Sequence, residues 1–286
     1  MTHCARPRRY KYYLALCKML TAIAQRRLNV DTRRLQTYLS SPSTRSLVER
    51  LVGKSYIKYN QFGTITGRLT THPGSFPLLT LRKDLRTVVL PTNDVFVELD
   101  FNGAEARVML GLLGLEQPRV DIHKYHQQSV FGGVVDREKA KSLFFAWLYG
   151  SRAAAASAEG KVLETFYHKE QILDKYWDGK NVHTPYRKEI SGVDEHHALN
   201  YIVQSTTAEL SLLQSLKIHE LLKSSSSHVA CIIHDAVVLD MRQQDMHLLE
   251  PIKKLMSSTK FGQFGINIST GKNLGHLTKK ESYAYG

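Results

Sequence analysis

Two aspartates stand at positions where metal-dependent chemistry is often placed. Asp100 follows the apolar run 95–99, and the chain then turns at Asn102 and Gly103. Asp235 lies between two further apolar runs, next to His234. A charge at the end of a buried strand needs a partner, and two converging carboxylates can hold divalent cations that stabilise both oxygens of a phosphoryl displacement. The simpler alternative for Asp100 is that it caps the following helix.

A helix expected over residues 136–150 carries two cations at matching spacing. Arg137, Lys141 and Phe145 recur at every fourth residue and therefore share one helix face. Two positive charges on one face can neutralise a triphosphate. The alternative for Phe145 and Tyr149 is a place in the core, which is the usual role of an aromatic stripe.

Apolar periodicity predicts the elements that place these residues. Alternation in residues 95–99 predicts a strand with one buried face, and residues 104–113 predict a helix after it. Residues 228–240 predict a hairpin with His234 and Asp235 at its tip, and a long helix is expected over 195–222. The stretch 59–74 predicts a strand and loop that lie on a ligand. The other expected elements are helices near 12–23, 31–39, 45–52, 121–132, 153–158, 162–176 and 244–257, a flexible serine linker at 224–227, and a last strand at 266–271.

The charge of the chain is strongly positive and unevenly distributed. The formal net charge is +13. Residues 1–99 hold 17 Lys or Arg against five acidic residues, a net of +12, whereas the rest holds 22 against 21, a net of +1. Such an excess indicates a polyanionic partner, although an acidic membrane surface or a merely soluble basic face fits the same count. No apolar run is long enough to span a membrane. The scattered cysteines favour a reducing compartment such as the cytoplasm.

In their order along the chain, these motifs resemble the polymerase module of family A DNA polymerases, the class of bacterial DNA polymerase I and several bacteriophage replicative enzymes. The resemblance covers about Asn60 to the C-terminus. The most specific match is Arg137-x-x-x-Lys141-x-x-x-Phe145-x-x-x-Tyr149-Gly150, which is similar to motif B. The other matches are Thr66-Gly67-Arg68-Leu69 (the TGRL segment), residues 100–107 (motif A), Asp121-Ile122-His123 (the D-I-H segment), Asn200-x-x-x-Gln204 (the minor-groove helix) and His234-Asp235 (motif C).

The resemblance implies a role for each matched residue. Asp100, Asp235 and Lys141 would be catalytic. Two Mg²⁺ ions, which Mn²⁺ can replace, would be held at Asp100, Phe101 and Asp235. The incoming dNTP would be bound by His123, Arg137, Lys141, Phe145, Tyr149 and Glu105, the last of which would exclude a ribose 2′-hydroxyl. The DNA primer–template would be bound by Arg68, Asn200, Gln204 and His234.

The fold that the resemblance implies is α+β. It consists of a palm, in which helices pack on an antiparallel sheet, and of helical fingers, with the thumb missing or vestigial. The chain would divide into a basic helical N-terminal segment (1–58, the reduced thumb region), a first part of the palm (59–115), the fingers (116–195) and a second part of the palm (196–286). Only residues 32–65 stand where the family has a long helical thumb. Asp31 and Glu49 cannot form an exonuclease site, so we expect a second protein that supplies thumb, exonuclease or processivity function.

Several residues depart from the family pattern. Ala236 stands where motif C usually has a third carboxylate, a Glu. Phe144 and Ala146 replace the commoner Asn and Gly of motif B, and Ser205 replaces a Gly that follows the minor-groove glutamine. Glu105, taken by its spacing alone, could also be a solvated helix residue, and the sequence around His123 also suits a helix start.

Three functions fit this sequence. In a DNA-templated DNA polymerase of viral or bacterial origin, the primer 3′-hydroxyl would attack the α-phosphate of a dNTP between the two metals, and pyrophosphate would leave past His123, Arg137 and Lys141. The alternatives are a catalytically weak or inactive polymerase-like subunit that binds primer–template, and a single-subunit RNA polymerase relative. The intact catalytic residues favour the first over the second, and Glu105 favours it over the third.

Overall fold

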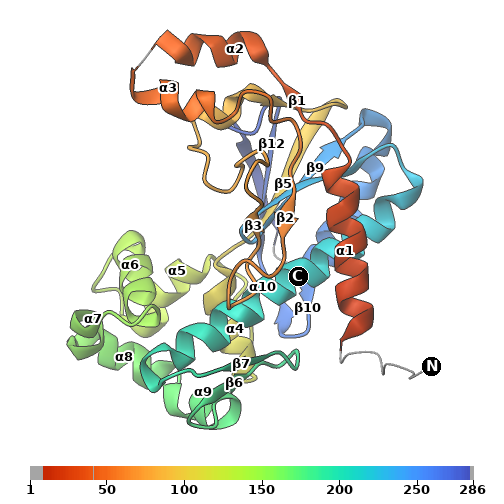
Figure 1. Ribbon diagram of the computed structural model, residues 1–286. Coiled ribbons are helices and arrows are strands. Elements are labelled where there is room, and N and C mark those ends of the chain that lie inside the picture. The colour runs from red at the N-terminus through yellow and green to blue at the C-terminus, as the bar shows by residue number, and fades with distance from the viewer. Residues whose placement is uncertain (1–8, 41, 284–286) are drawn as a thin grey trace.

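Five antiparallel strands form the central sheet of the computed structural model, which describes residues 9–40 and 42–283. The order across the sheet is β13-β12-β5-β9-β8, so strands from both halves of the chain lie side by side (Figure 1). The bounds are Val95–Phe101 (β5), His228–Ile233 (β8), Ala236–Met241 (β9), Ile266–Gly271 (β12) and Thr278–Tyr283 (β13). The sheet confirms the expected strand at 95–99, the hairpin at 228–240 and the strand at 266–271.

The central strand β5 buries one face along most of its length and the other face only at Phe96. Val97 and Leu99 have no exposed surface, and Phe96, which points to the opposite face, is only 3% exposed. The prediction of one buried face is confirmed for Val97, Leu99 and Phe101, and Phe96 is the exception, since Glu98 on its side of the strand is only half-buried. Asp100, which follows Leu99, is half-buried near the end of the strand.

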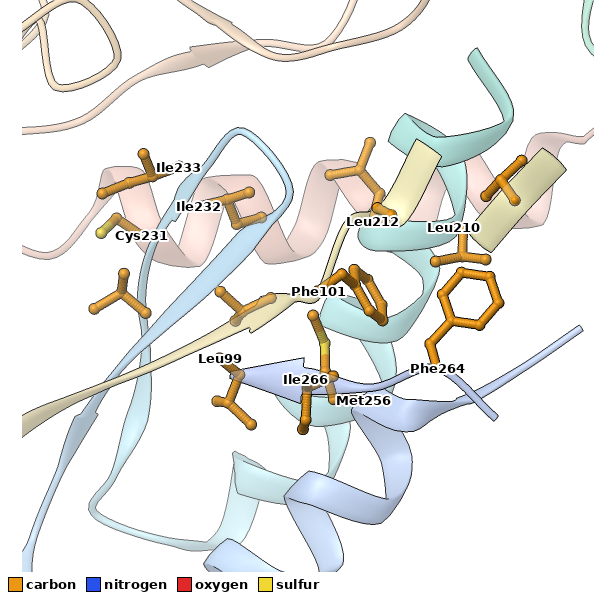
Figure 2. Close-up of a cluster of buried hydrophobic side chains, with 14 of the residues drawn as sticks. Leu99, Phe101, Leu210, Leu212, Cys231, Ile232, Ile233, Met256, Phe264 and Ile266 are labelled. Atoms are coloured by element: carbon orange, nitrogen blue, oxygen red, sulfur yellow. The ribbon is translucent and has the colours of Figure 1, made fainter. Parts of the chain in front are cut away.

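Four helices pack around the sheet and close its core. They are α1 (Tyr10–Ala24), α4 (Ala104–Leu112), α10 (Glu195–Leu221) and α11 (Leu249–Ser257). Helix α10 packs against α1, α4, α11 and β8, while α11 contacts β5 and β12. Figure 2 shows Leu210 and Leu212 of α10 facing Phe101, Phe264 and Met256 across this core. The predicted long helix and the apolar face of α1, which buries Leu16, Met19 and Ile23, are confirmed.

A second group of helices lies beside the N-terminal end of α10 (Figure 1). It contains α5 (Ile122–Tyr125), the π-helical turn η3 (His126–Val130), α6 (Arg137–Leu148), α7 (Arg152–Ala156), α8 (Ala158–Phe166) and α9 (Lys169–Tyr176). The prediction of one helix over 162–176 is wrong. The chain breaks after α8 at His168, which adopts a left-handed φ of 41°, a conformation that interrupts a helix.

The N-terminal segment packs against residues 85–90, which lie just before β5 in the sequence. Asp31 caps α2 (Thr32–Thr37) by accepting a hydrogen bond from the Arg34 N–H, as the sequence predicts. The other elements up to β5 are β1 (Asn29–Val30), η1 (Tyr38–Ser40), α3 (Pro42–Glu49), β2 (Tyr59–Asn60), β3 (Thr70–Thr71), η2 (Leu85–Val88) and β4 (Val89–Leu90). The pairs β1–β4 and β2–β3 are both antiparallel.

The short elements in the second half include two corrections to the sequence analysis. Ser227 is 1% exposed and hydrogen-bonds Asp245 through both its N–H and its hydroxyl, so residues 224–227 are not a flexible linker. Strand β13 follows β12, so residues 266–271 are not the last strand. The remaining elements are β6 (Asn181–His183), β7 (Glu189–Ser191), η4 (Leu222–Ser224), η5 (Gln243–Leu248), β10 (Ser258–Thr259) and β11 (Gly262–Gln263). Across the described ranges, no helix combines the length and apolarity needed to cross a membrane.

Candidate active site

The strand pairing brings Asp100 and Asp235 to the same end of the sheet. Leu99 of β5 is opposite Val237 of β9, so the next residue of β5, Asp100, lies beside the turn that joins β8 to β9. That turn contains only His234 and Asp235, because Ile233 pairs directly with Ala236. Two residues 135 positions apart in the sequence thus converge, as the sequence analysis expects.

The electrostatics of this pair disfavour two negative charges. Burial, with further contributions from Glu98 and Asp235, raises the pKa of Asp100 to about 7. Burial also raises the pKa of Asp235, against the opposing effect of Arg68. Within the described part of the chain, neither carboxylate accepts a hydrogen bond or forms an ion pair. Asp100 does not cap α4, whose N-cap is Gly103 with no side-chain bond.

This donor set fits a divalent cation. Two neighbouring carboxylates without hydrogen-bond partners lose their mutual repulsion when a cation is bound between them. Mg²⁺ is usually held by one or two carboxylates together with substrate phosphates and water. No group of three or more His, Cys, Asp or Glu in residues 9–40 and 42–283 is arranged to hold a metal, so the other ligands would come from substrate, water and backbone. The Phe101 carbonyl accepts the Gly103 N–H at 2.9 Å and keeps a second lone pair.

Beside the aspartates, Glu105 joins two other elements in a polar cluster. Its carboxylate accepts hydrogen bonds from the Arg68 guanidinium at 2.6 Å and from the Tyr149 hydroxyl at 2.8 Å. Glu105 is 4% exposed, so the alternative of a solvated helix residue is wrong. Burial raises the pKa of Glu105 and the Arg68 charge opposes this rise. The TGRL segment, α4 and the end of α6 are thereby tied together at one point.

Tyr149 also extends an aromatic surface that begins at Phe145. The two rings are stacked, with centroids 5.7 Å apart and planes inclined by 25°. Tyr149 is 44% exposed, while Phe145 is partly buried against the core. The alternative of a place in the core fits Phe145, which packs against the core, but not the exposed Tyr149. An exposed ring next to a carboxylate pair can stack on a base or a sugar.

Arg137 and His123 are placed by Asp121, a link that the sequence analysis did not anticipate. Asp121 caps α5 by accepting from the His123 and Lys124 N–H groups. It also takes two hydrogen bonds from the Arg137 guanidinium, at 3.0 and 2.8 Å. Burial raises the pKa of Asp121. The hydrogen bonds from Arg137 and Asn102 outweigh this effect and hold that pKa well below its usual range. Arg137 is 34% exposed and keeps part of its surface open.

His123 and Lys141 complete this side of the site. Burial lowers the pKa of His123 to about 4, so the ring is neutral at ordinary pH. Its Nδ1 is buried and has no hydrogen-bond partner among the described residues, and its ring centroid lies 5.8 Å from that of Phe145. Lys141 is exposed and close enough to Asp100 to lower the pKa of that carboxyl, against the effect of burial. A mobile ammonium beside the aspartates is suited to a polyphosphate.

Three further predicted residues lie in the β8–β9 turn and on α10. His234, at the tip of the β8–β9 turn, is exposed and has a left-handed φ of 54°. Asn200 and Gln204 stand one turn apart on α10, both half-buried, and the Asn200 Oδ1 is buried with no partner among the described residues. A polar atom of this kind is expected to be satisfied by water or by a ligand.

The loop that carries Arg68 and the turn after β5 are each held by a side-chain contact that the sequence did not indicate. The Lys188 ammonium, from the β6–β7 hairpin, donates to the Ile65 carbonyl at 2.7 Å. Asn102, in the turn after β5, bonds both Asp121 and the Ile122 N–H. Both links join segments far apart in the sequence. The side-chain types are common surface types, so only the fold reveals them.

No protein-family model matches the chain. It is 26% identical over 243 residues to the thermostable DNA polymerase I of Thermus thermophilus, covering 69% of this chain and 29% of that protein. DNA polymerase I of Caldicellulosiruptor bescii is 23% identical over 249 residues, covering 71% of this chain and 29% of the relative. The chain thus spans less than a third of the length of these curated relatives.

Among solved structures, the POL domain of Pol1 from M. smegmatis, in complex with DNA primer-template and dNTP, has a TM-score of 0.75 to this chain. The match covers 92% of this chain and 70% of that domain, at 13% sequence identity. It shows that the α+β fold is that of a family A polymerase domain. The shared sequence and the shared fold together support a family A polymerase module.

Proposed function

We propose that this chain is a DNA-templated DNA polymerase that joins a deoxynucleotide to a primer 3′-hydroxyl. The observation that carries the proposal is the convergence of Asp100 and Asp235 beside the cluster formed by Arg68, Glu105 and Tyr149. The relatives are named DNA polymerase I, and the structural neighbour binds primer-template and dNTP.

The reaction joins two phosphate-bearing substrates. The primer 3′-oxygen forms a bond to the α-phosphorus of the dNTP, the bond from that phosphorus to the bridging oxygen breaks, and pyrophosphate leaves while the hydroxyl proton passes to solvent. Asp100 and Asp235, with the Phe101 carbonyl, are the groups that would hold two Mg²⁺ ions. When bound, these ions supply charge stabilisation to the attacking and leaving oxygens.

The protein's own side chains orient the nucleotide. Lys141 and the open part of Arg137 neutralise the triphosphate, and neutral His123 offers a hydrogen bond to it without adding charge. Phe145 and Tyr149 present their stacked rings to the sugar and base. Glu105 would exclude a ribose 2′-hydroxyl, and its burial and its hydrogen bonds from Arg68 and Tyr149 support this role in the selection of deoxyribose.

The parts of the chain divide this work in the proposal. Residues 59–115 and 196–286 form the palm, with Asn200, Gln204, Arg68 and His234 against the primer–template. Residues 116–195 form the fingers. The basic segment 1–58 takes the place of the thumb and supplies phosphate contacts, and a second protein adds the grip or proofreading needed for long synthesis.

A primer-extension assay tests the function. Labelled primer–template is incubated with the chain and Mg²⁺, in separate reactions with dNTPs, with rNTPs or with no nucleotide. Template-dependent products with dNTPs alone are expected. Extension with rNTPs at equal efficiency would favour an RNA polymerase, and tight primer–template binding without any extension would favour an inactive subunit.

A further inference from the structure

A single tyrosine hydroxyl satisfies both backbone groups of a buried residue on the edge strand β8 of the sheet. Tyr59 Oη donates to the Ile232 carbonyl at 2.6 Å and accepts the Ile232 N–H at 2.9 Å. Strand β8 is the last strand on its side of the sheet, so the outward groups of Ile232 have no neighbouring strand. A phenolic hydroxyl can donate and accept at once, and here it takes the place of a sixth strand at one residue.

The contact between Tyr59 and Ile232 lies immediately before the turn that contains Asp235. Ile232 is followed by Ile233, which pairs with Ala236 and closes the two-residue turn (Figure 2). His234 in that turn has a left-handed φ of 54°, a conformation that costs free energy for a residue other than glycine and needs support from its surroundings. On the outer side of β8, the hydrogen bond to Tyr59 lies two residues before His234. Movement of Ile232 would therefore be passed on to the Asp235 carboxylate.

Tyr59 also connects this turn to the segment that carries Arg68. It belongs to β2 and pairs with Thr71 of β3, and the loop between these strands holds the TGRL residues. Tyr59 is 7% exposed, which fixes its ring in the core. Arg68 acts electrostatically on Asp235 and bonds Glu105. One hydroxyl thus sets the distance between the β2–β3 hairpin and the β8–β9 turn, which bear two charged groups of the site.

We propose that Tyr59 is a positioning residue, whose hydroxyl holds β8 so that the Asp235 and Asp100 carboxylates bind a divalent cation together. The inference rests on the proposed metal-dependent function. It concerns cation affinity, which can be measured without polymerase activity. Partners that orient a metal ligand typically contribute about 10-fold or more to affinity, which sets the size of the expected effect.

The test compares Tyr59→Phe, which removes only the hydroxyl, with Tyr38→Phe. The Tyr38 hydroxyl also bonds backbone and side-chain oxygens, those of Asp84 and Thr87, but in the N-terminal segment. Mn²⁺ binding to each full chain is titrated by electron paramagnetic resonance, and thermal unfolding is recorded in parallel. We expect Mn²⁺ to bind about 10-fold more weakly to Tyr59→Phe and unchanged to Tyr38→Phe, with similar decreases in Tm. Wild-type Mn²⁺ affinity in a folded Tyr59→Phe would overturn the proposal.

A second measurement applies even where Tyr59→Phe does not fold. 3-Fluorotyrosine at position 59 keeps the ring and the hydroxyl, and its fluorine resonance reports the hydrogen bond. Addition of Mg²⁺ is expected to shift this resonance with the same midpoint as cation binding, and the shift should be lost in Asp235→Asn. A resonance that does not respond to Mg²⁺ would contradict the coupling. Failure of primer extension in the wild-type chain with a normal fluorine response would instead count against the proposed function alone.

Discussion

At the scale of single residues, Glu105 shows how far spacing can predict a role. Its position five residues after Asp100 suggested a gate for the sugar, but spacing alone left a solvated helix residue equally open. The fold excludes the second, because Arg68 and Tyr149 both bond the carboxylate and leave it 4% exposed. A buried carboxylate with two donors is rigid, and rigidity is what steric exclusion of a hydroxyl requires.

Glu105→Ala is expected to relax sugar selection. The methyl group leaves space for a ribose 2′-hydroxyl, so the ratio of kcat/KM for dNTP over rNTP should fall by at least about 10-fold, or ~1.4 kcal/mol of discrimination. Single-nucleotide incorporation kinetics with a dNTP and the matching rNTP measure this ratio. Glu116→Ala, at an exposed site, serves as the control and should retain the wild-type ratio. An unchanged ratio in Glu105→Ala would assign Glu105 to structural support of Arg68.

At the scale of elements, periodicity predicted those parts of the fold that local sequence determines. The strand ending at Asp100, the β8–β9 hairpin and α10 were predictable because each has a continuous apolar pattern of its own. The bonds of Arg137 to Asp121 and of Tyr59 to Ile232 were not, since they join residues 16 and 173 positions apart. Such contacts depend on how elements pack. The sequence therefore indicated which residues form the site, while the partners that hold them required the fold.

The packing around His126, among the helices of residues 122–176, makes stability dependent on pH. His126 has no exposed surface and bonds the Tyr167 hydroxyl, and burial lowers its pKa to about 3. The unfolded chain takes up this proton near the ordinary value of 6.5, whereas the folded chain does not. Stability from the neutral ring is complete above pH 6.5 and is lost progressively as pH falls toward 3.

Denaturant unfolding between pH 7 and pH 4 tests this linkage. In wild type, His126 should contribute up to about 1.4 kcal/mol of lost stability per pH unit below 6.5. His126→Gln should show a shallower loss, although it is less stable at pH 7. His276→Gln, at an exposed site, should retain the wild-type slope. Equal slopes for all three proteins would show that protonation of His126 is not linked to unfolding.

At the scale of the whole molecule, the positive charge is concentrated in the N-terminal segment and in the first part of the proposed palm. Residues 1–99 carry a net charge of +12 from 17 basic and five acidic residues. In Figure 1 the helices α2 and α3 stand at the far end of the sheet from the helices of the proposed fingers. Phosphate contacts dominate the affinity of proteins for duplex DNA. A short basic segment can supply such contacts, but its longest described helix, α1, packs against α10.

The chain alone is therefore expected to extend a primer by only about ten nucleotides or fewer per encounter, with affinity falling steeply as salt rises. Single-encounter extension with a heparin trap measures this length. The double variant Arg45→Ala/Arg50→Ala should shorten the products further, whereas Lys180→Ala/Lys223→Ala, with two exposed cations outside the segment, should not. Products of hundreds of nucleotides at moderate salt would show that the palm grips DNA unaided.

The most direct measurement of the central claim is single-turnover incorporation by Asp100→Asn and Asp235→Asn, together with their affinity for primer–template. Both substitutions keep the shape of the side chain and remove the charge that would hold Mg²⁺. Each substitution is expected to lower the rate of incorporation by at least about 100-fold, or ~2.7 kcal/mol of transition-state stabilisation. The affinity for primer–template should change by less than about twofold, because the phosphate contacts come from other residues. Incorporation at more than about 10% of the wild-type rate in either variant would contradict the assignment of the two aspartates as the catalytic pair.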